Sequence, residues 1–330
     1  MSRVAVIGAG SWGTTLADLL ARKGHRVTLW AYEAEVVTSI NERHENTLFL
    51  PGCSLAPSLA ATGDLATAVA GVDAVVIGSP SHATRRVLGQ LAPALGPNPL
   101  IVSATKGIDP ETLDLMSDVA AQVLPLHRFV ALSGPSFAIE VFQGQPTAVV
   151  AASADPAAAR TVQELFAAPY FRVYTNGDVI GTQLAGSLKN VIAIAAGILE
   201  GLGLGHNPRA ALITRGLAEM TRLGVAMGAD PRTFAGLAGL GDLILTTGGS
   251  LSRNRTLGVA LAHGETLDSY RRAHRTVAEG ANTVLAAVQL GARHGVELPI
   301  ATEVAEVLFR GKPARQAIGE LIERDLKAEH

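Results

Sequence analysis

The sequence predicts a two-part protein, in which an α/β domain with a doubly wound, mostly parallel sheet is followed by an all-α domain. Two observations predict this division. Short apolar runs alternate with helical patterns over the first half of the chain, and almost no strand pattern follows "TNGD", residues 175–178. The 330 residues are enough for two domains of ordinary size. We therefore place the domains at residues 1–178 and 179–330.

Seven apolar runs in the first half are expected to be strands. They cover residues 4–7, 27–30, 74–77, 100–103, 129–132, 147–152 and 171–174. Several are apolar throughout, which is typical of parallel strands that helices cover on both faces. The helical patterns between most of them indicate βαβ units. Asp178 has the side chain of a helix N-cap, and it marks the start of the helical half.

Composition argues against several classes of function. The net charge of −2 provides no basic field for nucleic acid or an anionic membrane. The single cysteine, Cys53, excludes an intrachain disulfide, and the histidines lack the spacing of a zinc site, so we expect no metal. The beginning of the sequence lacks the pattern of a signal peptide, and the apolar stretch at 182–197 is too polar for a good membrane span. We expect a cytoplasmic protein.

Gly8, Gly10 and Gly13 form a G-x-G-x-x-G motif between a predicted strand and a predicted helix. In a βαβ unit, the first glycine permits a tight turn, the second lets the backbone approach a pyrophosphate, and the third lets helix and strand pack closely. The N–H groups at the helix start, from Ser11 onward, then face the phosphates. An ordinary glycine turn is the alternative, but this setting favours a dinucleotide site in a Rossmann-type domain.

Glu33 follows the second predicted strand, about 20 residues after Gly13, where an acidic side chain can bind the ribose 2′-hydroxyl. A carboxylate there would repel a 2′-phosphate, and Arg26 lies at the far end of the strand. This arrangement favours NAD(H) over NADP(H). The alternative is that Glu33 is a solvated loop residue.

Other polar residues stand where a ligand could bind. Lys106 in "SATKGI", and Gly134 and Ser136 in "LSGPSFAIEV", follow predicted strands, at the edge where open α/β sheets bind ligands. Each of these segments, taken singly, could be a plain loop. In the second half, the cluster at residues 252–255, "SRNR", suits a phosphate, although a solvated helix start has the same pattern. Asp242 is a lone acid in an apolar run, and such acids are seldom buried unpaired.

Lys189 is the only charged residue of "TQLAGSLKNVIAIAAG", residues 182–197. Helical spacing places it on one face with four small residues, Thr182, Gly186, Ala193 and Ala196. Two interpretations are open. The small residues could let another helix pack closely while the lysine reaches outward, or they could leave a space into which Lys189 points. The nearby dinucleotide loop, phosphate cluster and Asp242 favour the second interpretation.

Together these blocks resemble bacterial NAD(P)-dependent glycerol-3-phosphate dehydrogenase. The resemblance spans nearly the whole chain and is carried by "GAGSWGT", "ATKG", "LSGPSFAIEV", "FRVYTN", "GSLKNVIAIAAG", "ALITRGLAEM", "GLGDLILT", "SRNR" and "VAEG". It implies an oxidoreductase that uses NAD(H) or NADP(H) to interconvert dihydroxyacetone phosphate and sn-glycerol 3-phosphate for phospholipid synthesis. It also implies a Rossmann-type domain followed by a helical substrate domain. Several relatives that prefer NADPH carry His or Arg where Tyr32 and Glu33 stand here.

The resemblance also implies roles for single residues. Lys189 is implied as the proton donor and acceptor, and Lys106 as a contact to both substrate and cofactor; we expect Asp242 to orient Lys189. The other implied substrate contacts are Gly134, Ser136, Asn190, Asp242, Ser252, Arg253 and Asn254. The other implied cofactor contacts are Gly8, Gly10, Ser11, Trp12, Gly13, Tyr32, Glu33, Ala138, Arg253, Val277 and Glu279.

Two other functions fit parts of the sequence. One is a different two-domain dehydrogenase, acting on 6-phosphogluconate or a 3-hydroxy acid, because "SRNR" indicates a phosphate without fixing the carbon skeleton. The other is a dinucleotide-sensing regulator that binds the cofactor without turnover. A small-molecule substrate, no nucleic acid, no membrane span and a possible homodimer complete the expectations.

Overall fold

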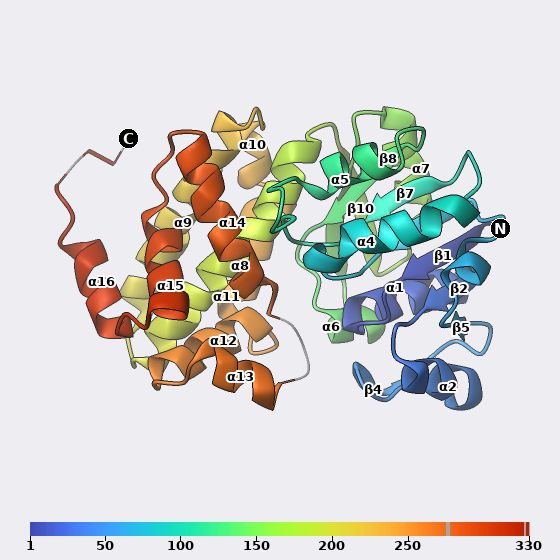
Figure 1. Ribbon diagram of the computed structural model, residues 1–330, viewed down its shortest axis with the longest axis horizontal. Helices are drawn as coiled ribbons and strands as arrows, with labels where there is room; N and C mark the ends of the chain where they lie inside the picture. Colours follow the sequence, from blue (N-terminus) through green and yellow to red (C-terminus); the bar gives the residue numbers. More distant parts are fainter. Residues whose placement is uncertain (275–277, 327, 330) are drawn as a thin grey trace. The chain divides into compact units, whose positions relative to one another are not determined.

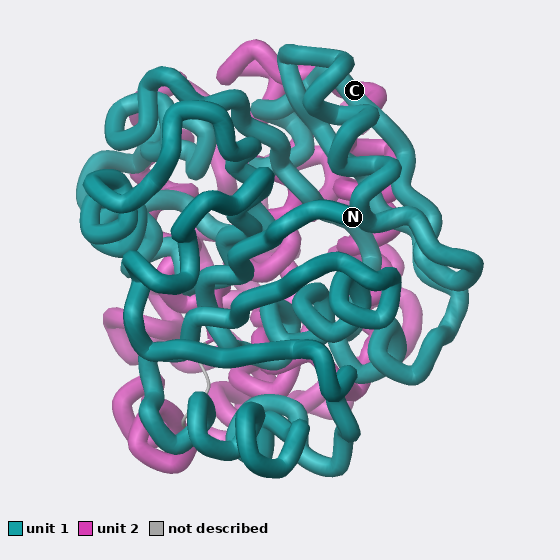
Figure 2. Tube along the Cα trace, turned by 90° about the vertical axis from the view of Figure 1, so that its right-hand side faces the viewer, with its two compact units in different colours: residues 1–183 teal, residues 184–330 magenta. Residues whose placement is uncertain are grey.

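The computed structural model describes residues 1–274, 278–326, 328 and 329. The chain divides into two compact units, Met1–Gln183 and Leu184–His330, which Figure 2 shows in different colours. Helix α8 (Val179–Gly201) runs across this division, so the predicted boundary after Asp178 coincides with the start of the helix rather than with the division itself. Asp178 has the predicted capping geometry, since its carboxylate accepts the Gly181 N–H at 2.8 Å.

Unit 1 is built on an eight-stranded sheet in the order β10-β9-β8-β7-β6-β1-β2-β5 (Figure 1). Its neighbouring strands are parallel except for the antiparallel pair β8–β9. All seven predicted strands are present, and the predicted fold class is confirmed. The strands are β1 (Arg3–Ile7), β2 (Arg26–Trp30), β5 (Ala60–Thr62), β6 (Ala74–Ile77), β7 (Leu100–Ser103), β8 (Phe129–Ser133), β9 (Thr147–Ala152) and β10 (Phe171–Asn176).

Three short strands lack a clear pattern in the sequence. Strands β3 (Glu45–Asn46) and β4 (Leu50–Ser54) form a separate antiparallel pair, and β4 contains Pro51 and Gly52, which disfavour a strand assignment. Strand β5 has the sequence Ala-Ala-Thr and is parallel to β2 at the sheet edge. Pairing with a neighbouring strand, rather than local propensity, determines these elements.

The helices of unit 1 cover both faces of the sheet. Along β1, Val4 and Val6 join one buried cluster while Ala5 and Ile7 join the other, because successive side chains point to opposite faces. Each large side chain buried in this way contributes about 1.5–3 kcal/mol. The first cluster includes residues of α1 (Ser11–Arg22), α2 (Ala34–Arg43), α6 (Ala138–Phe142) and α7 (Pro156–Phe166); the second includes residues of α3 (Leu65–Val69), α4 (Ser81–Leu91) and α5 (Met116–Val123).

The sheet order reverses between β1 and β6. From β1 the chain proceeds to β2 and β5 on one side, and it later returns to β6, β7 and β8 on the other. Because these strands are parallel, their carboxyl ends meet at one edge. Such a switch point is where doubly wound sheets bind ligands, and the predicted glycine loop leaves β1 at this edge.

The described part of unit 2 is helical. Its elements besides α8 are α9 (His206–Ala226), α10 (Pro231–Phe234), η2 (Leu237–Gly241), α11 (Asp242–Gly248), α12 (Arg253–Ala262), α13 (Leu267–Ala273), α14 (Glu279–Arg293), α15 (Pro299–Arg310) and α16 (Ala314–Ile322). Helix α8 is long and apolar enough to cross a membrane, but 83% of its most apolar window is buried in the structure. It is therefore a core helix.

Glycines let α12 cross α8 at backbone contact. A Cβ added to Gly258 would lie 2.0 Å from the Ile194 carbonyl oxygen, and one added to Gly197 would lie 2.0 Å from the Arg255 carbonyl oxygen. This close packing uses Gly197, which is not one of the four small residues on the face of Lys189, so helix packing against those four stays a prediction. The other part of that interpretation of "TQLAGSLKNVIAIAAG", an outward-reaching lysine, is wrong because Lys189 is buried.

Candidate active site

The three glycines of the β1–α1 loop meet three different steric demands. Gly8 has a φ of +111°, and a Cβ there would lie 2.8 Å from the Gly78 carbonyl carbon. A Cβ on Gly13 would lie 1.9 Å from the Gly8 carbonyl oxygen, so this residue allows the helix to pack on the turn. Around Gly10, by contrast, no atom of the surrounding protein that the structure describes lies within 4 Å of such a Cβ. The loop therefore leaves open space at Gly10, as a bound pyrophosphate requires.

The start of α1 offers hydrogen-bond donors beside this space. Gly10 is the N-cap and has no side chain that could occupy the first N–H groups of the helix. The Ser11 hydroxyl is already used, since it donates to the Phe49 carbonyl oxygen at 2.6 Å. The Trp12 indole Nε1 is buried and has no hydrogen-bond partner among the residues that the structure describes. Backbone donors at Ser11 and Trp12 thus fit a phosphate group.

Tyr32 and Glu33 lie at the carboxyl end of β2, at the same edge. Tyr32 is 76% exposed, and its ring lies edge-on to that of Trp30. Glu33 is half-buried and is the N-cap residue of α2, so a fixed backbone position holds it rather than a loose loop. Arg26 pairs with Arg3 at the opposite end of the strand, as the sequence predicted. No cation from β2 therefore stands beside Glu33.

A third group follows β7 and β8. The Lys106 ammonium donates to the Gly134 carbonyl oxygen at 2.8 Å, and the Ser136 hydroxyl donates to the same oxygen at 3.0 Å. Gly134 has a φ of +140°, and a Cβ there would lie 2.9 Å from the Cα of Val149. Ala138 begins α6 and accepts a hydrogen bond from the Thr15 hydroxyl. The three predicted residues Lys106, Gly134 and Ser136 therefore form one cluster.

In unit 2, Lys189 and Asp242 form a buried ion pair. The lysine Nζ lies 2.6 Å from Asp242 Oδ1, and the two side chains are 7% and 1% exposed. The hydroxyl oxygen of Thr246 also lies 2.6 Å from Nζ, and this hydroxyl is within 2.7 Å of the Asp242 carbonyl oxygen. Each charge of this buried pair depends on the other, because removing one residue would leave an uncompensated charge in the interior. The expectation that Asp242 is not buried unpaired is confirmed.

Sequence reasoning missed Thr246. It stands four residues after Asp242 on α11, so both side chains face the same way. Asp242 itself is the first residue of α11 and follows η2, a wide turn in which the Gly241 N–H donates to the Gly236 carbonyl oxygen. Wide turns of this type often occur at functional sites. The i, i+4 spacing in "DLILT" was the available signal.

The "SRNR" cluster opens α12, and its members have separate tasks. The Ser252 hydroxyl caps the helix by accepting the Arg255 N–H at 3.3 Å. Arg255 forms a two-pronged ion pair with Glu200 of α8, one contact of which is 2.7 Å long. Arg253 is exposed, in the first turn of the helix. The two arginines therefore differ: Arg255 is a structural cation, and Arg253 is the one that suits a ligand.

Asn254 connects α8 with α14. Its Nδ2 donates to Asn190 Oδ1 at 3.0 Å, and its Oδ1 accepts the Gly280 N–H at 2.9 Å. A Cβ on Gly280 would lie 2.6 Å from the Asn190 carbonyl oxygen, so a glycine is needed for this contact. Glu279, a predicted cofactor contact, is the first residue of α14. Val277, the other predicted contact in "VAEG", lies outside the described residues.

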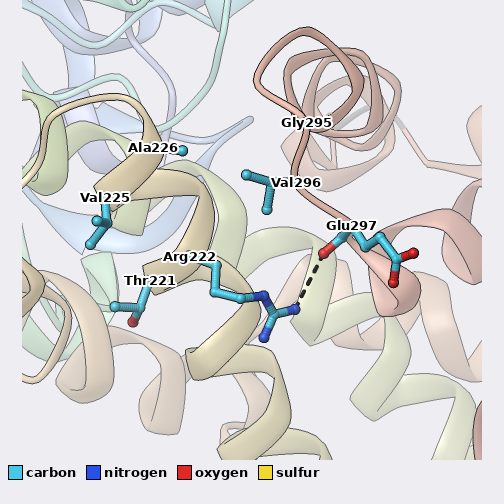
Figure 3. Close-up of a pocket in the computed structure, with 7 residues that line it drawn as sticks. All are labelled: Thr221, Arg222, Val225, Ala226, Gly295, Val296 and Glu297. Atoms are coloured by element: carbon cyan, nitrogen blue, oxygen red, sulfur yellow. Dashed lines mark hydrogen bonds between the residues drawn. The ribbon is translucent and has the colours of Figure 1, made fainter. Parts of the chain in front are cut away.

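One surface pocket of unit 2 has a volume of about 490 Å³ and is drawn in Figure 3. It is lined by α9 and the segment between α14 and α15, where Arg222 donates to the Glu297 carbonyl oxygen. None of the predicted site residues lines it. Over the described ranges, no group of three metal-ligating side chains could hold an ion.

Comparisons with known proteins agree across the whole chain. Residues 3–159 match the family model for the N-terminus of NAD-dependent glycerol-3-phosphate dehydrogenase, and residues 178–319 match the model for its C-terminus. Glycerol-3-phosphate dehydrogenase [NAD(P)+] of Geobacter sulfurreducens is 60% identical over 330 residues, which cover 99% of this chain and 98% of that protein. The corresponding protein of Moorella thermoacetica is 48% identical over 321 residues, covering 97% of this chain and 96% of that one.

Solved structures give the same result. The crystal structure of glycerol-3-phosphate dehydrogenase from Coxiella burnetii has a TM-score of 0.95 and 40% identity, covering 98% of this chain and 99% of that one. A ketopantoate reductase from Ralstonia eutropha, at 18% identity and a TM-score of 0.60 over 97% of this chain and all of that one, shares the fold alone. The glycine loop, the buried lysine and these full-length matches lead to one conclusion: the chain belongs to the NAD-dependent glycerol-3-phosphate dehydrogenase family and is an NAD(P)-dependent oxidoreductase.

Proposed function

We propose that this protein interconverts dihydroxyacetone phosphate and sn-glycerol 3-phosphate, with Lys189 as the residue that transfers the proton. The observation that carries this proposal is the buried contact of Lys189 with Asp242 and Thr246. A lysine held by a carboxylate and a hydroxyl is fixed in position and can exchange a proton with a bound alkoxide. The alternative of a regulator without turnover gives no reason for burying this pair.

The cofactor and the protein supply different parts of the reaction, the hydride and the proton. A bound nicotinamide would supply the hydride that reaches the carbonyl carbon. Lys189 then donates a proton to the developing alkoxide, and Asp242 compensates the charge of the ammonium before transfer. Thr246 limits the rotation of Nζ, because its hydroxyl lies 2.6 Å from that atom. In the oxidative direction the same lysine accepts the proton.

Arg253 is proposed as the main phosphate contact, with Ser252 and Asn254 beside it in the first turn of α12. Its guanidinium can bind two phosphate oxygens at once, and the start of a helix also favours an anion. Arg255 is excluded from this role by its ion pair with Glu200. Asn190, bonded to Asn254, and the cluster of Lys106, Gly134 and Ser136 are proposed as further substrate contacts.

We propose NAD(H) as the preferred cofactor. The glycine loop, with the N–H groups of Ser11 and Trp12, would hold the pyrophosphate, and Glu33 would accept a hydrogen bond from the ribose 2′-hydroxyl. Tyr32, Lys106, Ala138, Arg253 and Glu279 complete the proposed contacts, and Val277 stays a sequence-based prediction. A 2′-phosphate would meet the Glu33 carboxylate, which has the same sign of charge.

The test measures dihydroxyacetone phosphate reduction with NADH and NADPH in parallel. We expect kcat/KM to be about tenfold or more higher with NADH, since tenfold corresponds to about 1.4 kcal/mol, a modest charge repulsion. Glu33→Arg should reverse the preference, whereas Glu42→Ala, on the exposed end of α2, should not change it. A wide margin in favour of NADPH in the unaltered protein would refute the role of Glu33. No reduction with either cofactor would refute the substrate.

We further propose a cytoplasmic enzyme that needs no metal, forms a homodimer and supplies glycerol 3-phosphate for phospholipid synthesis. The sequence supports the second point, because its histidines lack the spacing of a metal site. Undiminished turnover after treatment with a chelator, and a dimer mass in solution by light scattering, are the expected results.

A further inference from the structure

Arg85, which no motif of the sequence singled out, makes four side-chain hydrogen bonds in unit 1. It stands on α4, and its Nε donates to Asp109 at 2.9 Å. Its two terminal nitrogens donate to Gln122 at 2.7 Å, to Asp114 at 2.8 Å and to Thr112 at 3.1 Å. The guanidinium thus joins α4 to the segment at 109–114 and to α5. A lysine could not replace it, because only a planar fork reaches several acceptors at once.

The segment that Arg85 holds is a closed loop. Asp109 is 4% exposed, and its second carboxylate oxygen accepts the N–H groups of Glu111 and Thr112 at 3.0 and 3.2 Å. The Asp109 N–H donates to the Asp114 carbonyl oxygen at 3.0 Å, which closes the loop at its ends. Leu113 has a φ of +67°, a strained conformation for leucine that persists only where its surroundings hold it. The Asp109 carboxylate is the centre of this arrangement, and Arg85 is the cation that balances it.

This loop begins three residues after Lys106. Gly107 and Ile108 are buried between them, so the short connection has little freedom. On the other side of Lys106, the Thr105 hydroxyl donates to the Ser79 carbonyl oxygen at 2.8 Å. Lys106 is therefore fixed from both sides: by Thr105, which is bonded to Ser79 just after β6, and by Asp109 through Arg85.

We propose that Arg85 is a positioning residue, which holds the loop after β7 so that the Lys106 ammonium stays on the Gly134 carbonyl oxygen. Without Arg85, the Asp109 carboxylate would be buried without its cation, and the loop would open to hydrate it. Opening moves Ile108 and Gly107, and with them Lys106. The inference rests on the proposed role of Lys106 in binding substrate and cofactor.

The test is a double-mutant cycle between Arg85→Gln and Lys106→Met, with kcat/KM for dihydroxyacetone phosphate as the readout and thermal unfolding as the control for folding. Arg85→Gln alone should lower kcat/KM about tenfold, and Arg85→Lys should lower it less. In the Lys106→Met background, Arg85→Gln should change kcat/KM by less than about twofold, because coupled residues are not additive. Arg86→Gln is the matched control: Arg86 is the exposed neighbour on the same helix, and its substitution should leave kcat/KM unchanged.

The results that would contradict the roles of Arg85 and Lys106 are as follows. If the fold-losses in kcat/KM of the two single variants multiply in the double variant, Arg85 acts independently of Lys106 and the inference is overturned. An unchanged kcat/KM in folded Arg85→Gln would overturn it as well. Wild-type activity in Lys106→Met would refute the proposed role of Lys106, and the inference with it. If Arg85→Gln unfolds, Asp114→Asn is used in its place. Asp114 binds one nitrogen of the fork, so this substitution should give a smaller loss that still disappears in the Lys106→Met background.

Discussion

The dinucleotide edge of unit 1 and the lysine cluster of unit 2 are built from different materials. The first is mostly backbone: glycines that shape a turn, N–H groups at a helix start, and open space at Gly10. The second is mostly side chains: a lysine, a carboxylate and a hydroxyl that meet in the interior. The difference follows from the tasks, because a pyrophosphate needs many donors close to the main chain, whereas a proton transfer needs one side chain at one point.

The comparison predicts that the lysine cluster is the more sensitive of the two to loss of one side chain. Lys189→Met should lower kcat by about 10²–10⁴-fold, because the proton donor is lost. NADH binding, measured by fluorescence titration, should persist. Lys189→Met would leave Asp242 buried and unpaired, which should lower the free energy of unfolding by about 3–5 kcal/mol. The double variant Lys189→Met/Asp242→Asn removes this unpaired charge and so separates loss of catalysis from loss of folding. Turnover within a few-fold of the unaltered protein would refute the assignment.

At the dinucleotide edge, we expect the largest effects from substitutions that add a methyl group close to the backbone. Gly13→Ala places a methyl group 1.9 Å from the Gly8 carbonyl oxygen, so the helix must shift; we expect a loss of about 1–3 kcal/mol in stability and of dinucleotide binding. Gly10→Ala meets open space at a φ of −64°, so the poorer N-cap and the stiffer unfolded chain should offset each other, and stability should change by less than about 1 kcal/mol. Dinucleotide affinity should nevertheless fall about tenfold, or about 1.4 kcal/mol. Thermal unfolding without cofactor and NADH titration check both variants. Equal effects of the two substitutions on stability would contradict this distinction.

A smaller effect is expected at a second buried acid of unit 2, which is held by backbone N–H groups instead of a lysine. Glu219 of α9 is 4% exposed and accepts the N–H groups of Ile300 and Ala301 at the start of α15. Burial raises the pKa of Glu219, and the hydrogen bonds from Ala301 and Ile300 oppose this only in part. A pKa that is higher in the folded than in the unfolded chain gives stability that is present below the unfolded value and is lost as pH rises through the folded value.

Glu219→Gln has no proton to lose, so its unfolding midpoint relative to the unaltered protein should rise between about pH 5 and pH 8. Thermal unfolding of both proteins across this range is the measurement. A relative midpoint that stays level over the same range would mean that the backbone donors offset the effect of burial, and that Glu219 is already ionised in the folded protein.

Particular residues show why some features could be predicted and others could not. The seven predicted strands depend on apolar runs of neighbouring residues, and the glycine loop depends on three residues within one turn, so both are local. Strands β3, β4 and β5 were missed because only pairing makes them strands. Thr246 was missed because its importance comes from Lys189, 57 positions away in the sequence. Arg85 was missed for the same reason, since its partners Asp109 and Gln122 are 24 and 37 positions away.

The sequence by itself determined the alternation of strands and helices, the dinucleotide loop and the presence of an unusual lysine in an apolar helix. These depend on the backbone and on residues near one another in the chain, where periodicity and turn chemistry act directly. Only the tertiary structure decided that Lys189 is buried rather than reaching outward, that Arg255 rather than Arg253 is tied to Glu200, and that Gly197 and Gly258 bring α12 onto α8. A charge is buried only where another element brings its partner, and that pairing is fixed by the packing of distant segments.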